Sequence, residues 1–259
     1  MRISIMTLFP EMCERVMEES IIGRARRAGK LQADCWQIRD YTLDKFGRVD
    51  DTPYGGGMGM LLQADPIYRC YEAVCQTAEK RPHVIFMSPQ GKTLTQDRAF
   101  QLSRKEHLLL VCGHYEGVDQ RVLDEIVDEE LSIGDYVLTG GELAALVVAD
   151  CVGRLCPGVL SDHTCFTEES HWNGLLEYPQ YTRPAQWHDQ GIPEVLLSGH
   201  HKNIEAWRHQ RALENTWRKR PEMLEHANLS EADLKFLKEL EQGEQICSQE
   251  DSSNEENLA

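Results

Sequence analysis

The stretch LLLVCGHYEGVDQRVLDEIVDEELSIGDYVLTGGELAAL, residues 108–146, decides the fold of this chain. It opens with an apolar, strand-like run that breaks at Gly113, crosses an acidic helix-like segment, and returns as a second apolar run that breaks at Gly140 and Gly141. A helix-like segment then begins at Glu142. An apolar strand that ends in glycine and leads into a helix is typical of an α/β unit, whose ligands bind at the carboxyl ends of the strands. We therefore expect a site where residues 113–117 and 133–141 meet.

A third corner of the same kind lies earlier in the chain. The apolar run 83–87 stops at the sequence SPQG, residues 88–91, and residues 94–102 have the pattern of a helix. Three corners are more than one α/β unit supplies, so we predict a parallel sheet whose carboxyl edge is lined with backbone amides and carbonyls. Neither GxGxxG nor GxxxxGKS/T occurs, which argues against the usual dinucleotide fold and against a P-loop.

The first sixty residues predict two strands, one helix and a glycine-rich loop. Residues 1–9 and 31–38 have strand patterns, and the helix between them is expected from Pro10 to about Ala28, with Gly29 as its C-cap. In the irregular stretch 40–60, four of the five residues 55–59 are glycine, which excludes a helix or a central strand. Such a loop lets a backbone approach a ligand or a partner chain closely; a flexible connector is the alternative.

Composition limits the class of protein. With 259 residues and 41% hydrophobic content, the chain can bury an ordinary core and holds one large or two modest domains. There is no apolar run of roughly 18 residues, and the N-terminus lacks the layout of a secretory signal, so we expect a cytoplasmic protein with no membrane partner. The nine cysteines form no Cys-x-x-Cys pair. We expect buried, reduced thiols rather than a disulfide framework or a zinc site.

The charge is unevenly distributed along the chain. The formal net charge of -16 argues at first sight against a polyanionic partner, because phosphate contacts need Lys and Arg. Residues 239–259, however, contain acidic residues and no Lys or Arg, whereas residues 200–220, HHKNIEAWRHQRALENTWRKR, are strongly basic and include two tryptophans. A basic helical face with aromatics is a modest signal for nucleic-acid binding, and a solvated helix face explains the same pattern.

Four parts follow from these patterns. We expect an α/β ligand-binding domain over residues 1–160, a flexible interdomain linker over 161–176, a mostly helical domain over 177–240, and an acidic, disordered tail over 241–259. The linker is polar and lacks periodicity, and it contains the paired carboxylates Glu168 and Glu169. We find no internal repeat.

Eight stretches, in order between residues 1 and 224, resemble a known family: ISIMTLFPEM, VDDTPYGGGMGM, SPQGKTL, VCGHYEGVDQRV, SIGDYVLTGGEL, RLCPGVL, LLEYPQYTRP and VLLSGHHKNIEAWR. The family is the bacterial tRNA (guanine-N1)-methyltransferase of the SPOUT superfamily. The resemblance implies methylation of N1 of guanosine at nucleotide 37 of tRNA, next to the anticodon, with S-adenosylmethionine as methyl donor. It also implies a homodimer, a deep trefoil knot in the parallel sheet, a small helical C-terminal domain that holds tRNA, and no DNA partner.

The resemblance assigns the three corners to the cofactor. The adenosine and methionine parts are expected to contact Ser88, Pro89, Gly113, Tyr115, Glu116, Ile133, Gly134, Asp135, Tyr136, Val137, Leu138, Gly140 and Gly141. Family members also need Mg²⁺, a hard cation that prefers carboxylates. Glu116, Glu169 and Glu177 are the acids that the resemblance would place near methyl transfer; solvated or salt-bridged loop acids are the alternative for Glu116 and Glu177. The spacing of His163, Cys165, His200 and His201 fits no familiar zinc pattern.

Methylation of guanine at N1 requires a base and a cation or hydrogen-bond donor. N1 of guanine carries a proton at neutral pH and is a poor nucleophile, so a base must remove that proton. Negative charge then builds on O6 and needs a fixed cation or donor. The resemblance implies that Arg154 meets O6 and that Glu169 takes the proton, with Glu168 as the competing candidate.

This chain departs from the family pattern at four places. Glu169 stands where Asp is typical, one methylene further from the backbone, and we expect the flexible linker to compensate. Ala144 and Met58 stand where Pro is common, and His114 stands where Arg is common. A knotted ribose 2′-O-methyltransferase and a non-catalytic RNA-binding module remain as alternative functions.

Overall fold

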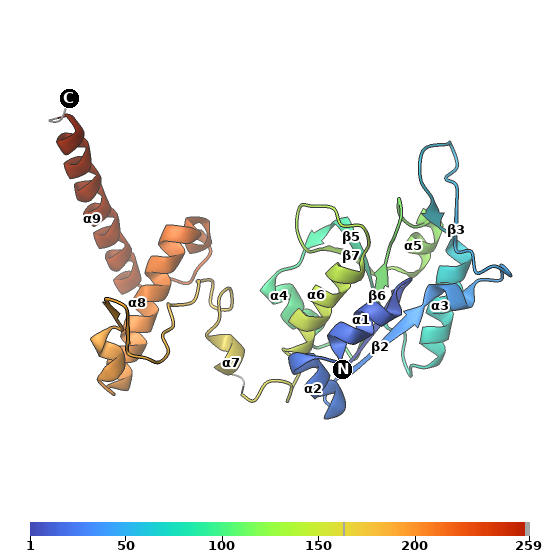
Figure 1. Cartoon of the computed structure of the whole chain (residues 1–259), viewed down its shortest axis with the longest axis horizontal. Helices are drawn as coiled ribbons and strands as arrows, with labels where there is room; N and C mark the ends of the chain where they lie inside the picture. Colours follow the sequence, from blue (N-terminus) through green and yellow to red (C-terminus); the bar gives the residue numbers. More distant parts are fainter. Residues whose placement is uncertain (163, 257–259) are drawn as a thin grey trace. The chain divides into compact units, whose positions relative to one another are not determined.

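The chain forms two compact units, Met1–Asp162 and His163–Ala259, and each is described by itself (Figure 1). The structure is a computed structural model that describes residues 1–162 and 164–256. Within these residues, no helix is both long and apolar enough to cross a bilayer. The elements of the first unit are β1 (Arg2–Thr7), α1 (Pro10–Met17), α2 (Ser20–Arg27), β2 (Gln32–Gln37), η1 (Ile38–Tyr41), β3 (Asp50–Asp51), β4 (Leu61–Leu62), α3 (Ala64–Gln76), β5 (His83–Thr93), α4 (Gln96–Leu102), β6 (His107–Cys112), α5 (Gln120–Ile126), β7 (Glu129–Ser132) and α6 (Glu142–Gly153).

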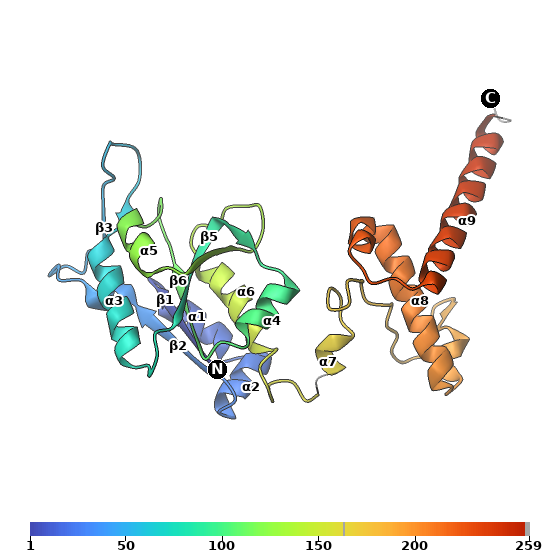
Figure 2. The same ribbon diagram turned by 180° about the vertical axis from the view of Figure 1, so that it is seen from behind.

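A five-stranded parallel sheet forms the centre of the first unit, in the order β2-β1-β6-β5-β7. Every residue of the central strand β6 is buried, because a parallel sheet carries helices on both faces. Helices α3 and α5 contact each other on one face, while α6 contacts α1 and α4 on the other (Figure 1 and Figure 2). The predicted α/β fold with a parallel sheet is confirmed.

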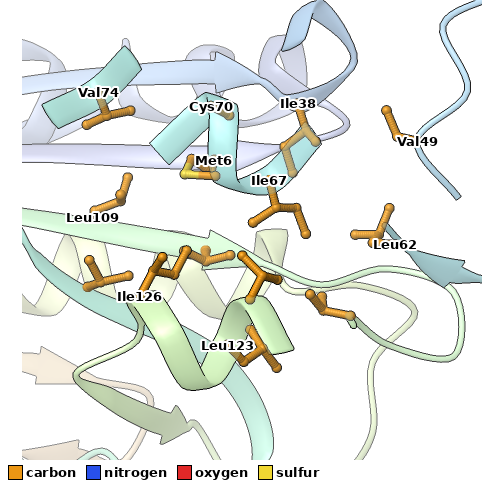
Figure 3. Packing of buried hydrophobic residues seen from close by; sticks show 14 of the residues in the cluster. Met6, Ile38, Val49, Leu62, Ile67, Cys70, Val74, Leu109, Leu123 and Ile126 are labelled. Atoms are coloured by element: carbon orange, nitrogen blue, oxygen red, sulfur yellow. The ribbon is translucent and has the colours of Figure 1, made fainter. Parts of the chain in front are cut away.

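The core between the sheet and the helices α3 and α5 explains the apolar pattern of the strands. Met6 and Leu109, from neighbouring strands, are fully buried against Ile67 and Val74 of α3 (Figure 3). Ile126 of α5 completes the contact and is 1% exposed. Because successive strand residues point to opposite faces, the strand neighbours of these residues face the other helix layer, around α6.

Three elements differ from the sequence predictions. The single helix predicted over residues 10–28 is wrong, because the chain breaks into α1 and α2; Ser20 has a φ of 52°, which a regular right-handed helix cannot contain. The corner at residues 88–91 lies inside β5, which continues to Thr93 after a register shift against β7. The second apolar run is strand only as far as Ser132, and residues 133–141 form the loop that follows.

The second unit is mostly helical among its described residues. Its elements are α7 (Thr164–Thr167), β8 (Gln186–Trp187), β9 (Gln190–Gly191), η2 (Glu194–Leu197), α8 (His201–Lys219), η3 (Pro221–Glu225) and α9 (Glu231–Glu256). Helices α8 and α9 pack together and bury Leu213 and Leu237. Helix α9 continues to Glu256 and enters the acidic segment expected to be disordered, so the disorder of that segment in solution stays a prediction.

The cysteines whose side chains are described form no disulfide. Cys13, Cys70, Cys112 and Cys156 are buried, while Cys165 is exposed. Burial raises the pKa of the Cys70 thiol above the ordinary value, and the same holds for Cys112. These two thiols are therefore neutral and unreactive near pH 7, as expected from the sequence.

Candidate functional site

A pocket of about 360 Å³ lies at the carboxyl edge of the sheet. Its volume is within the range of small-molecule sites in proteins. The expected cofactor-binding residues all line it except Asp135, so the structure brings the three corners into one place. They are Ser88, Pro89, Gly113, Tyr115, Glu116, Ile133, Gly134, Tyr136, Val137, Leu138, Gly140 and Gly141.

Two of the corners are held side by side by backbone contacts. The amide of Gly141 donates to the carbonyl of Gly113 at 2.9 Å, and His114 pairs with Gly140 in an antiparallel bridge. A Cβ atom on Gly141 would lie 2.8 Å from the Cα atom of Cys112, closer than real side chains come. Glycine at this position therefore permits the close approach that joins the end of β6 to the start of α6.

The loop after β7 forms the rim of the pocket. The hydroxyl of Ser132 donates to the carbonyl of Gly134 at 3.0 Å, and the Tyr136 hydroxyl donates to the carbonyl of Ile133 at 3.3 Å. Gly134 has a φ of 151°, a backbone conformation that other residues rarely adopt. Val137, at the rim, is 81% exposed, so the loop presents an apolar side chain to solvent.

The corner at residues 88–91 supplies the third wall. Ser88 is buried, and its hydroxyl accepts from the amide of Gln90 at 3.1 Å. A Cβ on Gly91 would lie 2.4 Å from the backbone of Glu130, so this glycine lets β5 and β7 stay adjacent through the register shift. The corner is thereby fixed against β7 rather than free to move as a surface loop.

The glycine-rich loop approaches the same region. The amide of Glu116 donates to the carbonyl of Met60 at 3.0 Å, and a Cβ on Gly59 would lie 2.3 Å from the Glu116 side chain. The close approach expected of this loop is therefore made to the corner at residues 113–117. Tyr54 and Met58, at the tip of the loop, are 100% and 93% exposed.

A buried acid lies behind the pocket. Glu142, at the start of α6, is 4% exposed and accepts a hydrogen bond from the Thr7 hydroxyl at 2.7 Å. Its other oxygen, Oε2, faces Nδ1 of His114 at 4.0 Å. A carboxylate is favoured here because the first turn of a helix carries partial positive charge. His114 also contacts the rings of Phe9 and Tyr115, which fix its plane.

Sequence reasoning missed several pocket residues. Phe86, Gln120 and Glu130 line the cavity, although they lie outside the three corners at residues 88–91, 113–117 and 133–141. For Phe86 and Glu130, the usable signal is nearness in sequence: Phe86 comes two residues before the corner at residues 88–91, and Glu130 lies in β7, just before the loop at residues 133–141. Gln90 and His114 lie inside the predicted corners and also line the pocket, although neither was among the residues expected to contact the cofactor.

The expected catalytic residues lie in different units. Arg154 follows α6 in the first unit, is half-buried, and donates its backbone amide to the carbonyl of Asp150. Glu169 follows α7 in the second unit and lines a shallow pocket with Glu168 and Glu177. The Glu168 carboxylate lies 4.0 Å from the Nη1 atom of Arg208.

The expected metal ligands are divided in the same way. Glu116 belongs to the first unit, and Glu169 and Glu177 to the second. Among the described side chains, no group of three His, Cys, Asp or Glu residues is arranged to hold a metal ion. The Mg²⁺ set therefore stays a prediction.

Much of the basic charge on α8 already has partners. Arg211 and Arg218 both pair with Glu214, and Arg208 stacks on the ring of Tyr178 at 4.9 Å. Trp207 contacts Tyr181. The Arg208 stack therefore presents an aromatic and cationic surface near Glu168, in the same unit.

An open parallel sheet with helices on both faces, and a pocket built from its carboxyl-edge loops, is the arrangement found in α/β proteins that bind small molecules. Residues 1–226 match the family described as tRNA (Guanine-1)-methyltransferase TrmD. The chain is 57% identical, over 86% of its length and 96% of the relative, to a tRNA (guanine-N(1)-)-methyltransferase of Ruminiclostridium cellulolyticum. It is 51% identical to that of Moorella thermoacetica over 94% of its length and 98% of the relative.

A solved structure is also similar. The crystal structure of tRNA (m1G37) methyltransferase from Aquifex aeolicus is 41% identical in sequence and superposes with a TM-score of 0.71, covering 85% of this chain and 93% of that chain. This chain belongs to the tRNA (guanine-1)-methyltransferase family.

Proposed function

We propose that this protein transfers a methyl group from S-adenosylmethionine to N1 of guanosine at nucleotide 37 of tRNA. The observation that carries the proposal is the convergence of three loop corners on one pocket in a chain that belongs to this family. The names of the relatives state the guanine-N1 chemistry, and the solved structure's name states position 37.

The pocket suits a methyl donor that carries a purine and a cationic sulfonium. Its walls combine apolar side chains, such as Phe86 and Leu138, with glycine backbone at residues 113 and 140–141. Apolar walls and exposed backbone groups match a flat purine whose edge needs hydrogen bonds. Glu116 and Glu130 add negative charge, which attracts a cation. S-adenosylmethionine, when bound, supplies the electrophilic methyl group.

Arg154 and Glu169 are the residues we assign to the guanine. The Arg154 guanidinium would meet the charge that builds on O6, and the Glu169 carboxylate would take the proton from N1.

The active form is proposed to be a homodimer in which one subunit's pocket receives the other subunit's Glu169. An exposed apolar face supports this: Phe9, Met12 and Val16 at α1, with Leu143 and Val147 of α6, are each at least 40% exposed, and α1 packs against α6. Large apolar patches on a folded unit mark interaction surfaces. Sedimentation of a Val16→Glu/Val147→Glu variant should show a smaller species than the wild type.

The knot, the Mg²⁺ ion and the tRNA surface complete the proposal. The return of residues 133–141 to the end of β6 is compatible with a trefoil knot, which the family resemblance implies. Glu116, Glu169 and Glu177 would be the acids that hold the Mg²⁺ ion, a hard cation that prefers carboxylates. Lys202, Arg208, Arg211, Arg218, Lys219 and Arg220 would contact tRNA phosphates, and the target guanine would leave its stack to be read at its edge. The protein would act in the cytoplasm.

The test is a methyl-transfer assay on unmodified tRNA transcripts. A transcript with guanosine at nucleotide 37 should yield 1-methylguanosine in its nucleoside digest, while a matched transcript with adenosine there should yield none. A ribose-methylated product would instead indicate a knotted 2′-O-methyltransferase. Tight tRNA and cofactor binding without any product would indicate a non-catalytic RNA-binding module.

A further inference from the structure

A second cleft, of about 640 Å³, lies at the amino-terminal edge of the sheet, opposite the cofactor pocket. Two loops form it, one leading from α3 into β5 and the other from α4 into β6, together with the first residues of β1 and β2. The N mark in Figure 1 lies at this edge. None of the residues assigned above to methyl transfer lines the cleft.

The cleft is cationic in a strongly acidic chain. Five Lys or Arg residues and three acidic residues line it, whereas the whole chain carries a formal net charge of -16. The five basic residues are Arg2, Lys80, Arg81, Arg104 and Lys105. A cleft lined by Lys and Arg has a positive local electrostatic potential even when the net charge of the whole protein is negative.

Two of these cations are free to bind a ligand. Arg2 pairs with Asp34, Lys80 with Glu106, and Arg81 with Asp128. In contrast, no acid among the described residues lies within ion-pair distance of Arg104 or Lys105, and both side chains are exposed. Arg104 lies over the ring of Phe100 at 4.2 Å, which holds its guanidinium in place.

A buried histidine in the same cleft has an unused nitrogen. His107, at the start of β6, is 9% exposed, and its Nε2 atom lies 2.9 Å from the Ser4 hydroxyl. Its Nδ1 atom has no hydrogen-bond partner in the described part of the chain. Burial and the charge of Arg2 lower the pKa of His107 to about 4, so the ring is neutral at pH 7. A buried polar atom without a protein partner calls for a water or a ligand group.

The shape of the cleft favours an extended ligand. Its residues stand at the amino ends of four neighbouring strands, β2, β1, β6 and β5, which together span about 14 Å. That length exceeds one phosphate group and suits consecutive phosphates of a nucleic-acid strand. We propose that this cleft is a second contact site for the phosphate backbone of tRNA, with Arg104 and Lys105 as its uncommitted cations. The choice of tRNA as the source of the phosphates rests on the proposed function.

The test removes the two uncommitted charges. An Arg104→Ala/Lys105→Ala variant should bind tRNA roughly tenfold more weakly near 0.1 M salt, in filter binding without a methyl donor. The slope of log affinity against log salt should fall by about two, one for each lost phosphate contact. The rate at saturating tRNA should be unchanged, because the cleft is at the far edge of the sheet from the pocket. Arg104→Lys/Lys105→Arg should restore the affinity.

The matched control is Arg24→Ala/Lys30→Ala, which removes two exposed charges of the same unit outside the cleft. It should bind tRNA within about twofold of the wild type if net charge alone has little effect. Wild-type affinity in the cleft variant, or an equal loss in the control, would overturn the proposal. The wild type could also bind inorganic pyrophosphate in the cleft, while the cleft substitutions leave the tRNA affinity unchanged. That result would overturn the assignment to RNA in favour of a small phosphate ligand.

Failure of the two proposals can be told apart. If the wild type binds tRNA through the cleft but forms no 1-methylguanosine, the methyl-transfer proposal fails and the cleft proposal stands. If 1-methylguanosine forms normally and the cleft variant has unchanged tRNA affinity, the cleft proposal fails and the methyl-transfer proposal stands.

Discussion

The Nδ1 atom of His114 lies 4.0 Å from Oε2 of the buried Glu142, on the inner side of the loop that carries Gly140. A Cβ on Gly140 would lie 2.4 Å from Glu142 Oε2 and 2.5 Å from His114 Nδ1, so the backbone of this glycine packs directly on the two polar groups. Glu142 thereby links three parts of the chain: β1 through Thr7, α6, and the pocket corner at His114.

Replacing Glu142 should loosen this corner. Glu142→Ala removes the acceptor of the Thr7 hydroxyl and leaves a buried cavity, so we expect a stability loss of about 2 kcal/mol and weaker cofactor binding. Glu142→Gln keeps an acceptor for Thr7 and should lose less. Urea unfolding and calorimetric titration with S-adenosylmethionine measure the two effects. Equal behaviour of both variants would show that the Thr7 bond is unimportant.

Adding one methyl group at Gly141 should separate two pocket loops. The new Cβ would lie 2.8 Å from Cys112 Cα, a backbone atom that cannot swing aside, so we expect about 2 kcal/mol of destabilisation and reduced cofactor affinity. Gly191→Ala is the control, because a Cβ added there would have no neighbouring atom within 4 Å. Thermal unfolding of both variants checks the prediction. A wild-type melting temperature for Gly141→Ala would contradict the close packing.

Removing the carboxylate at position 169 should stop proton removal. Glu169→Gln should reduce the methyl-transfer rate roughly 100-fold or more, because a general base contributes that much. Glu169→Asp keeps the carboxylate and should preserve or improve the rate. The matched control is Glu168→Gln, which removes the neighbouring acid that faces Arg208. Single-turnover kinetics separate chemistry from tRNA binding; full activity of Glu169→Gln would place the base elsewhere.

Removing the guanidinium of Arg154 should affect turnover and spare cofactor binding. Arg154→Ala should lose roughly 100-fold or more in rate, because a fixed donor opposite a developing oxyanion has about that effect. The affinity for S-adenosylmethionine should stay near that of the wild type, since Arg154 does not line the pocket. An unchanged rate would remove the O6 role from this residue.

Acid should weaken the fold through His107. Its pKa is lowered to about 4 from an ordinary value of 6.5, so the unfolded chain takes up a proton before the folded chain does. The contribution of the neutral His107 ring to the free energy of unfolding is therefore complete above pH 6.5, and it declines as the pH falls toward 4. Between pH 7 and pH 5 this amounts to about 2 kcal/mol. Urea unfolding at both pH values should show a smaller pH dependence for His107→Gln than for the wild type.

The sequence by itself determined the layers of the fold and the position of the pocket. Apolar runs that end in glycine identify the carboxyl ends of buried strands, because a parallel sheet buries both faces of each strand and its ligands bind where the strands end. For this reason the corners at residues 113–117 and 133–141 could be assigned to one site from the sequence, and the family resemblance added the corner at residues 88–91. The family resemblance added the chemistry of the site and the residues expected to carry it.

Only the tertiary structure decided how distant residues meet. The contacts of Thr7 with Glu142 and of Gly59 with Glu116 join residues far apart in the chain, and no local periodicity encodes such pairs. The break at Ser20 and the register shift in β5 were likewise not predicted from local patterns in the sequence. The cationic cleft was equally hidden, because Arg2, Lys80 and Lys105 are far apart in the sequence and become neighbours only when their strands align.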